Sequence, residues 1–409
     1  MSYRFLFFSL VFSTSILAQE ISINTIFQRV TTHNPTVKVK ELEYQIQKSE
    51  ETQTFKNLYL PPVVVSNENR LDSIRDEGLK LNTLEARVDV FNGLKDYNTF
   101  KKTSNNVYLS EQEIFLTTLS EQERGINDYF LALNYENQVK IFNSAIDTLN
   151  KQYYRLKRMF EENQLSPKSE YLKILSDIED LKSLKAQYQA AALNSKESLF
   201  KILNYPLNSN FTLKEFSIGE DFPDFQPTLK NTPPEKTTLG KREQLILKNS
   251  EYDFKIAKSE FFPTVYVKAI KDFYEDSEDG YYPSHDGRVE LGFSYSFNWG
   301  STVDKVNQKK FEMKKAGINY TENIKEIELR MRTKYREIQS LIEQSSAQEK
   351  RVAILKENLK IDNLRFESDL ITTFDYLNSL NQLVSSQENL YKTQRDLVLS
   401  KIEYDNLFK

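Results

Sequence analysis

The chain has 409 residues, 39% of them hydrophobic and 28% charged, and a formal net charge of −4 at pH 7, without the basic domain or stripe that a nucleic-acid binder carries. It contains no cysteine and two histidines, which excludes disulfides, thiolate metal sites and thiol nucleophiles and argues against imidazole clusters for catalysis or metal binding. Only 10 Gly and 11 Pro are available for turns, so few and long elements are expected.

The N-terminal segment has the pattern of a secretory signal peptide. Arg4 supplies a positive charge, an apolar run follows from Phe5 to Leu17, and Ala18 is a small residue before the expected cleavage at Gln19. A retained anchor is the alternative, but the run is short for a membrane span. No later segment approaches roughly 20 apolar residues, so a mature chain that enters a membrane is expected to do so as a closed β-barrel.

The rest of the chain reads as two halves with the same order of elements: helix, strand, strand, very long helix and returning helix. Leu60-Pro61 matches Phe262-Pro263, and Phe91-Asn92-Gly93 matches Phe297-Asn298-Trp299-Gly300. Five prolines between the halves indicate an extended connector. We therefore predict a signal peptide over residues 1–18, a first structural repeat over 19–204, a proline-rich connector over 205–236 and a second structural repeat over 237–409.

Both halves contain apolar residues at coiled-coil spacing. No break interrupts the helical pattern from about Asp96 to Phe160 or from Val303 to Phe366, which implies helices of roughly 95 Å. A helix packed on an ordinary core is the alternative, but the sequence has no strand-rich core for it to cover. The predicted seams are Phe142, Ile146, Leu149, Tyr153, Leu156 and Phe160 in the first half, and Tyr376, Leu380, Leu383, Gln387, Leu390, Gln394 and Leu397 in the second.

Two segments alternate apolar and polar residues with period two, as in strands that have one apolar face. The apolar residues predicted to face a membrane are Leu84, Ala86, Val88 and Val90 in the first half, and Val289, Leu291, Phe293, Tyr295 and Phe297 in the second. Tyr281, Tyr282 and Trp299 near the strand ends suit a membrane interface. The alternative is a soluble, half-buried hairpin, which the pattern alone does not exclude.

The sequence contains no catalytic constellation. Gly-x-Ser-x-Gly, a phosphate-binding glycine loop and His-Glu-x-x-His are all absent. Adjacent acids such as Glu161-Glu162 are read as solvated charge, and His285 as an ordinary loop histidine. We therefore expect no enzymatic activity, no cofactor and no metal site.

The order of several short motifs resembles the TolC family of outer-membrane efflux proteins. Ile23–Val39, with His33-Asn34-Pro35, is similar to that family's first helix, and Leu60-Pro61 to the opening of its first strand. Val90-Phe91-Asn92-Gly93 resembles its junction between strand and long helix. Arg365–Ile371 followed by Phe374-Asp375-Tyr376-Leu377 resembles its helix turn, although Asn163 and Asp369 stand where the family has a turn glycine. Both residue types tolerate the left-handed backbone better than most.

The resemblance implies an α+β membrane protein, made mostly of long coiled-coil helices. Four strands per chain would contribute to a twelve-strand outer-membrane β-barrel in a homotrimer, and the helices would continue as a periplasmic α-barrel. The implied function is a passive exit duct in the cell outer membrane, with a periplasmic extension, for a tripartite efflux pump or a type I secretion system. The implied partners are a periplasmic adaptor (membrane fusion) protein, an inner-membrane pump and outer-membrane lipid.

The same resemblance implies a closed periplasmic tip formed by the turns at Glu161–Ser166 and Glu367–Thr373. Asn163, Asp369 and Asp375 are the candidate tip or gate residues. As a threefold ring the two acids would favour cations, with Lys168, Arg365 or Lys360 holding the tip closed. The alternative for Asp375 is helix capping, because it lies near a helix N-terminus. Asn378, where many members have a second acid, argues against a strongly acidic constriction.

Two other functions compete with the channel. A periplasmic coiled-coil adaptor would contain one helical hairpin flanked by glycine-rich β domains, whereas here the hairpin is predicted twice and glycine is scarce. A secreted structural coiled-coil protein would have no need of amphipathic strand pairs.

Overall fold

The computed structural model describes residues 20–60, 62–71, 78–163, 167–209, 211–217, 232–276, 280–282 and 287–408. The predicted signal peptide lies outside the described residues, as do Pro61, the turn 164–166 and His285.

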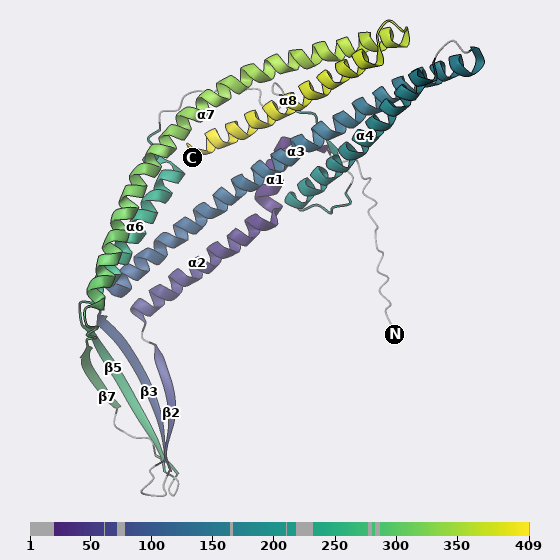
Figure 1. Ribbon diagram of the computed structural model, residues 1–409. Helices are drawn as coiled ribbons and strands as arrows, with labels where there is room; N and C mark the ends of the chain where they lie inside the picture. Colours follow the sequence, from purple (N-terminus) through teal and green to yellow (C-terminus); the bar gives the residue numbers. More distant parts are fainter. Residues whose placement is uncertain are drawn as a thin grey trace, which may run out of the picture. The chain divides into compact units, whose positions relative to one another are not determined.

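Figure 1 shows two very long helices, each followed by a returning helix. α3 (Lys95–Asn163) has 69 residues and α7 (Ser301–Glu367) has 67, which confirms the two long helices predicted from the sequence. α4 (Lys168–Ile202) and α8 (Thr373–Asn406) return from them. The other elements are β1 (Glu20–Ile21), α1 (Ile23–His33), α2 (Pro35–Tyr59), β2 (Val63–Leu71), β3 (Gly78–Phe91), β4 (Thr212–Leu213), η1 (Pro234–Lys236), α6 (Thr238–Ser259), β5 (Thr264–Asp276), β6 (Gly280–Tyr282) and β7 (Gly287–Ser294).

The chain forms two compact units, each of which takes residues from both predicted repeats. Unit 1 consists of Met1–Val37, Thr118–Thr228 and Arg336–Ile402, and unit 2 of Lys38–Thr117, Leu229–Tyr335 and Glu403–Lys409. The order α2-β2-β3-α3-α4 is followed by α6-β5-β7-α7-α8, with β6 as a short addition. The boundaries of the two sequence repeats and of the connector stay predictions.

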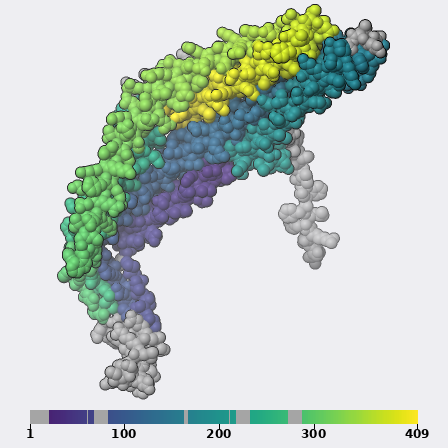
Figure 2. All heavy atoms as spheres, viewed as in Figure 1, coloured from purple at the N-terminus to yellow at the C-terminus, as the bar shows by residue number. Residues whose placement is uncertain are grey.

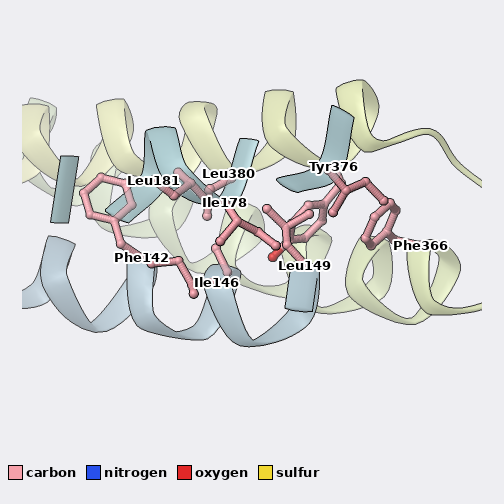
Figure 3. Packing of buried hydrophobic residues seen from close by; sticks show 10 residues of the cluster. Phe142, Ile146, Leu149, Ile178, Leu181, Phe366, Tyr376 and Leu380 are labelled. Atoms are coloured by element: carbon pink, nitrogen blue, oxygen red, sulfur yellow. The ribbon is translucent and has the colours of Figure 1, made fainter. Parts of the chain in front are cut away.

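A hydrophobic core of unit 1 lies where α3, α4, α7 and α8 meet (Figure 3). Leu149 of α3, Ile178 of α4 and Tyr376 of α8 are at most 1% exposed. The rings of Phe366 and Tyr376 stack with centroids 5.0 Å apart. In Figure 2 the yellow spheres of α8 fill the space between α7 and the α3–α4 pair. The first seam is therefore confirmed at Phe142, Ile146 and Leu149, and the second at Tyr376, Leu380, Leu383 and Leu397.

A break at Asn34 separates α1 from α2, so the stretch Ile23–Val39, which resembles the family's first helix, belongs to two helices. Pro35 has no N–H and disfavours helical backbone in the residue before it. Asn34 is 1% exposed and caps the new helix, because its Oδ1 accepts a bond of 3.1 Å from the Val37 amide. Its Nδ2 donates to the Ile202 carbonyl at 2.8 Å, which ties the break to the end of α4.

Unit 2 contains an antiparallel sheet in which β3 lies between β2 and β5, and both β6 and β7 pair with the other side of β5. Leu84 pairs with Val65 across β2 and β3, and Val88 pairs with Val267 across β3 and β5. Val267 pairs in turn with Leu291 of β7. Directly paired residues point to the same face, so this register fixes the two faces of the sheet.

Left-handed backbone turns the chain from β3 and from β7 into the long helix that follows each of them. After β3, Gly93 and Leu94 have φ of 67° and 64°, and after β7, Trp299 and Gly300 have φ of 48° and 89°. A Cβ on Gly93 would lie 2.9 Å from the Ser259 carbonyl oxygen, whereas a Cβ on Gly300 would have no neighbour within 4 Å. Gly93 is therefore required by conformation and by close packing, and Gly300 by conformation alone.

We predict that Gly93→Ala destabilises the protein more than Gly300→Ala does. Both changes force alanine into left-handed backbone, at about 1–2 kcal/mol, but only Gly93→Ala also pushes a methyl group into the backbone of α6. Thermal unfolding followed by circular dichroism should give a lower midpoint for Gly93→Ala. Equal midpoints would mean that the contact with Ser259 relaxes without loss.

Candidate functional site

The part of one sheet face that lies nearest the helices is apolar and exposed, whereas Asn67 and Lys271 lie farther along the same face. Val65, Val289, Leu291 and Phe293 are 75% to 77% exposed, and Val88 is 38% exposed. The register places them on one face with Val63, Leu84, Ala86, Val265, Val267 and Ala269. A contiguous exposed apolar patch of this kind indicates a surface that contacts lipid or an apolar surface of another protein.

The opposite face is charged and internally paired. Lys268 of β5 lies 2.7 Å from Glu85 of β3, and Arg87 lies 3.0 Å from Asp89. The Arg87 guanidinium also stacks 4.0 Å above the ring of Tyr266. The two faces therefore suit two different surroundings, one apolar and one aqueous.

The candidate strand residues lie in three places, which are the apolar face, a bulge in β3 and the segment after β7. Leu84, Val88, Leu291 and Phe293 lie on the apolar face. Val90 is 64% exposed and lies within the register shift between Asp89 and Phe91, as the extra residue of a bulge.

Tyr295 and Phe297 follow the end of β7, so their assignment to a strand is wrong. Ser294 makes the last pair, with Thr264, and the preceding Pro263 has no N–H to continue the ladder. Trp299 lies in the turn before α7 and is 90% exposed. The side chains of Tyr281 and Tyr282 lie outside the described part of the chain.

The turn between α7 and α8 is closed by left-handed backbone at Asp369, with φ of 59°. The Leu370 amide donates to the Arg365 carbonyl at 2.8 Å across this residue, as in the usual ending of a helix. An aspartate therefore adopts the backbone conformation for which the TolC family, which this chain resembles, uses glycine. Asn163 is the last residue of α3, and its side chain lies outside the described part of the chain.

The side chain of Asp369 is bound to α3. Its Oδ1 accepts a bond of 2.7 Å from Gln152 Nε2 and forms an ion pair with Arg155. Arg155 Nη1 also donates to the Glu367 carbonyl at 3.0 Å. Sequence reasoning missed Gln152 and Arg155, because they belong to the other long helix and lie far from Asp369 along the chain.

Two of the three basic residues expected to hold the tip form ion pairs elsewhere. Arg365 lies 3.6 Å from Asp362, and Lys360 lies 3.8 Å from Glu357, each within α7. Within one chain Asp369 is instead paired with Arg155, whose long side chain reaches the turn from the neighbouring helix. The expectation that Lys168, Arg365 or Lys360 hold the tip closed stays a prediction.

Asp375 caps helix α8. Its Oδ2 accepts bonds from the Thr372 amide at 3.1 Å and the Thr372 hydroxyl at 2.7 Å, and its own amide donates to Thr372 Oγ1 at 3.2 Å. These bonds form a reciprocal capping box. The hydrogen bonds from Thr372 lower the pKa of Asp375 below its ordinary value. Within one chain, Asp375 therefore acts in helix capping, which is the alternative to a role in a ring of acids.

Two large apolar side chains are exposed at the same turn. Leu370 is 70% exposed and Phe374 is 72% exposed.

Among the described residues, no group of three or more His, Cys, Asp or Glu is arranged to hold a metal ion. No helix in the described ranges combines the length and apolar character needed to cross a membrane.

Outer-membrane channels share a fold of long antiparallel helix pairs and an antiparallel sheet, here built from β2, β3, β5 and β7 with the short β6 added. The Campylobacter jejuni CmeC outer membrane channel matches with a TM-score of 0.74 at 15% identity, over 94% of this chain and 85% of that chain. The outer membrane protein VceC of Vibrio cholerae matches with a TM-score of 0.71 at 14% identity, over 94% and 95% of the two chains. The open state of the Neisseria gonorrhoeae MtrE outer membrane channel matches with a TM-score of 0.72 at 14% identity, over 94% and 88%.

The chain therefore has the fold of the TolC-family outer-membrane channels, as the resemblance predicted. No protein-family model and no curated protein matches the sequence.

We predict that Thr372→Ala lowers the stability of the α7–α8 hairpin by about 1 kcal/mol at neutral pH, as loss of an N-cap usually does. The lowered pKa of Asp375 means that the charged form is favoured in the folded state. Its contribution is thus complete above the ordinary aspartate pKa and is lost as the pH falls through the lowered value.

Thermal unfolding at neutral and acidic pH should show a difference between wild type and Thr372→Ala that shrinks in acid. Thr373→Ala, at the adjacent position, serves as the control and should show no such pH dependence. A difference that stays constant with pH would contradict the capping role of Asp375.

Proposed function

We propose that this chain is one protomer of a homotrimeric exit duct of the outer membrane, through which substrates of an efflux pump or a type I secretion system leave the cell. The observation that carries the proposal is the two-faced sheet at one end of helices of 69 and 67 residues. Its exposed apolar face suits lipid, and its ion-paired face suits a water-filled passage.

Closure into a barrel follows from the open edges of the sheet. In lipid, each backbone N–H and C=O needs a partner within the protein, and a sheet with edges does not provide one for all. Three copies with four main strands each would close the sheet and remove its edges. The fold shared with bacterial outer-membrane channels supports this assembly.

The turn between α7 and α8 is the proposed contact for a periplasmic adaptor that links the duct to an inner-membrane pump. The exposed Leu370 and Phe374 give this turn an apolar surface with the size of side chain that partner proteins use as anchors. A secreted structural coiled coil is the competing function, but it leaves the exposed apolar face of the sheet without a role.

We further propose that the bonds from Gln152 and Arg155 to Asp369 hold the α7–α8 turn against α3. A partner that replaces these bonds would release the turn from α3. Binding of the partner would thus shift the equilibrium at this end of the duct from the state with the turn bound to the state with the turn released. Asn163, Asp369 and Asp375 remain the candidate gate residues, with Asp369 neutralised by Arg155 in this conformation.

The membrane role is tested by placing arginine on either face of the sheet. Val65→Arg and Leu291→Arg should each impair assembly by about 2–4 kcal/mol if the site lies near the middle of the bilayer. Ser66→Arg and Ser294→Arg, which lie next to apolar-face residues but on the opposite face, should assemble normally. The measurement is the yield of heat-modifiable oligomer in the outer-membrane fraction. Equal yields from all four variants would rule out a membrane-facing role for the apolar face.

The role of the tip is tested by ion conductance of the reconstituted protein. Arg155→Gln removes the ion-pair partner of Asp369 and leaves the hydrogen bond from Gln152, so conductance and cation preference should both rise. The double variant Asp369→Asn and Asp375→Asn should lose cation preference while still forming oligomers. Unchanged selectivity in both variants would place the constriction elsewhere in the duct.

A further inference from the structure

A pocket of about 280 Å³ lies between three helices of unit 1, α3, α7 and α8. The residues that each helix contributes are three or four positions apart, such as Lys140 and Ser144 of α3 or Lys356 and Lys360 of α7. Residues at this spacing share one face of a helix. Because all three faces belong to unit 1, the pocket is formed within a single chain.

The base of the pocket is apolar and buried. Tyr376 and Leu380 of α8 are each 1% exposed and belong to the core drawn in Figure 3. Ala145 of α3 and Leu383 of α8 are buried beside them. Burial raises the pKa of the Tyr376 hydroxyl to about 12, so this group stays neutral and adds no negative charge to the pocket. A ligand that reaches the base therefore needs an apolar body.

The rim of the pocket is basic. Lys140, Lys356 and Lys360 are exposed there, and no acid is among the described residues that line the pocket. Lys140 Nζ donates to the neutral side chain of Asn137 at 3.1 Å, and Lys360 lies 3.8 Å from Glu357 in an exposed pair. Exposed ion pairs are weak, so the three ammonium groups together give the rim a positive potential that attracts anions.

One polar group in the wall of the pocket lacks a partner. The Oδ1 atom of Asn363 is buried and accepts no hydrogen bond from the described residues. Asn363 follows Lys360 by three positions and Lys356 by seven, so it lies on the same face of α7 as the two lysines. The side-chain amide can turn to place Nδ2 where Oδ1 lies, and it then donates a hydrogen bond into the pocket.

We propose that this pocket binds a small organic anion, with one carboxylate on an apolar body of one or two rings. The body lies against Tyr376 and Leu380 at the base, and the carboxylate accepts bonds from Lys356, Lys360 and the amide of Asn363. Ligand pockets usually enclose about 300–1,000 Å³, so a pocket of about 280 Å³ suits a ligand at the small end of the range.

The bland alternative is that the lysine stems only cover apolar surface while their charged ends stay in water. That alternative leaves two observations without a reason, the lack of acids among the described lining residues and the buried Asn363 oxygen. The inference goes beyond the proposed duct and does not depend on it, because the pocket lies within one chain.

Binding is tested with 2-naphthoate and its neutral counterpart 2-naphthamide, each titrated into the purified protein in a non-ionic detergent and followed by probe fluorescence. The carboxylate should bind saturably and the amide at least tenfold more weakly. Added salt should weaken binding of the carboxylate, since exposed charges are screened. Equal binding of the two compounds, or no saturable binding of 2-naphthoate, would overturn the proposal.

Variants locate the site. Lys356→Gln combined with Lys360→Gln should weaken 2-naphthoate binding by about tenfold, because exposed ion pairs contribute a few-fold each. Asn363→Asp keeps the size of the side chain but places a carboxylate in the wall, so it should also weaken binding. Lys350→Gln changes an exposed lysine of α7 outside the pocket and should bind as wild type does. Wild-type affinity in both pocket variants would place the binding elsewhere and sink the inference.

Thermal unfolding gives a second readout. A ligand that binds only the folded protein raises the unfolding midpoint, so 2-naphthoate should raise it for wild type and Lys350→Gln but not for the double lysine variant. Where a pocket variant does not fold, as judged by circular dichroism, Ser144→Phe takes its place. This change fills the pocket from an exposed position and should abolish binding. Midpoint shifts of equal size in all variants would contradict the proposed site.

Discussion

The edges of the sheet impose the constraint on which the rest of the molecule depends. β2 and β7 each have a hydrogen-bonded neighbour on one side only in the described chain, and the face between them carries exposed Val65, Leu291 and Phe293. Unpaired backbone groups and an apolar face are both unfavourable in water, and unpaired backbone is still less favourable in lipid. A single chain provides neither hydrogen-bond partners for the two edge strands nor cover for the apolar face. Strands of further copies would pair with the edges, and lipid would cover the face. These open edges and this exposed face are the observations on which the proposed oligomeric barrel rests.

Unit 1 has a core within a single chain, but that core is partly polar. Gln138 is fully buried among helices, and its Nε2 donates to the Asn134 side chain at 3.3 Å and to the Val384 carbonyl at 3.2 Å. Gln387, at a seam position of α8, is 5% exposed, and its Oε1 has no hydrogen-bond partner among the described residues. Polar residues at seam positions lower the stability of a coiled coil and restrict it to one register. For helices of this length, a defined register has a clear benefit, because a slip of one heptad would displace the whole turn.

The α7–α8 turn shows how the same acid residues serve the fold before any role in transport. Asp369 adopts left-handed backbone and is bound by Gln152 and Arg155, and Asp375 closes a capping box with Thr372. Both carboxylates are therefore hydrogen-bonded within the chain, and Asp369 is also ion-paired to Arg155 of α3.

Local periodicity was enough to predict most elements of the chain, whereas the meeting of distant residues could be seen only in the folded protein. The two very long helices, the seam from Phe142 to Leu149 and the alternation from Leu84 to Val88 follow from spacing, and the order of motifs predicted the fold shared with outer-membrane channels. Spacing did not predict that Arg155 binds Asp369, nor that apolar residues of α2 and α7 such as Leu42 and Ile318 stay exposed while the seams of α3 and α8 are buried. Periodicity fixes that a helix has an apolar face, but what covers that face depends on the path of the whole chain, which local sequence does not encode.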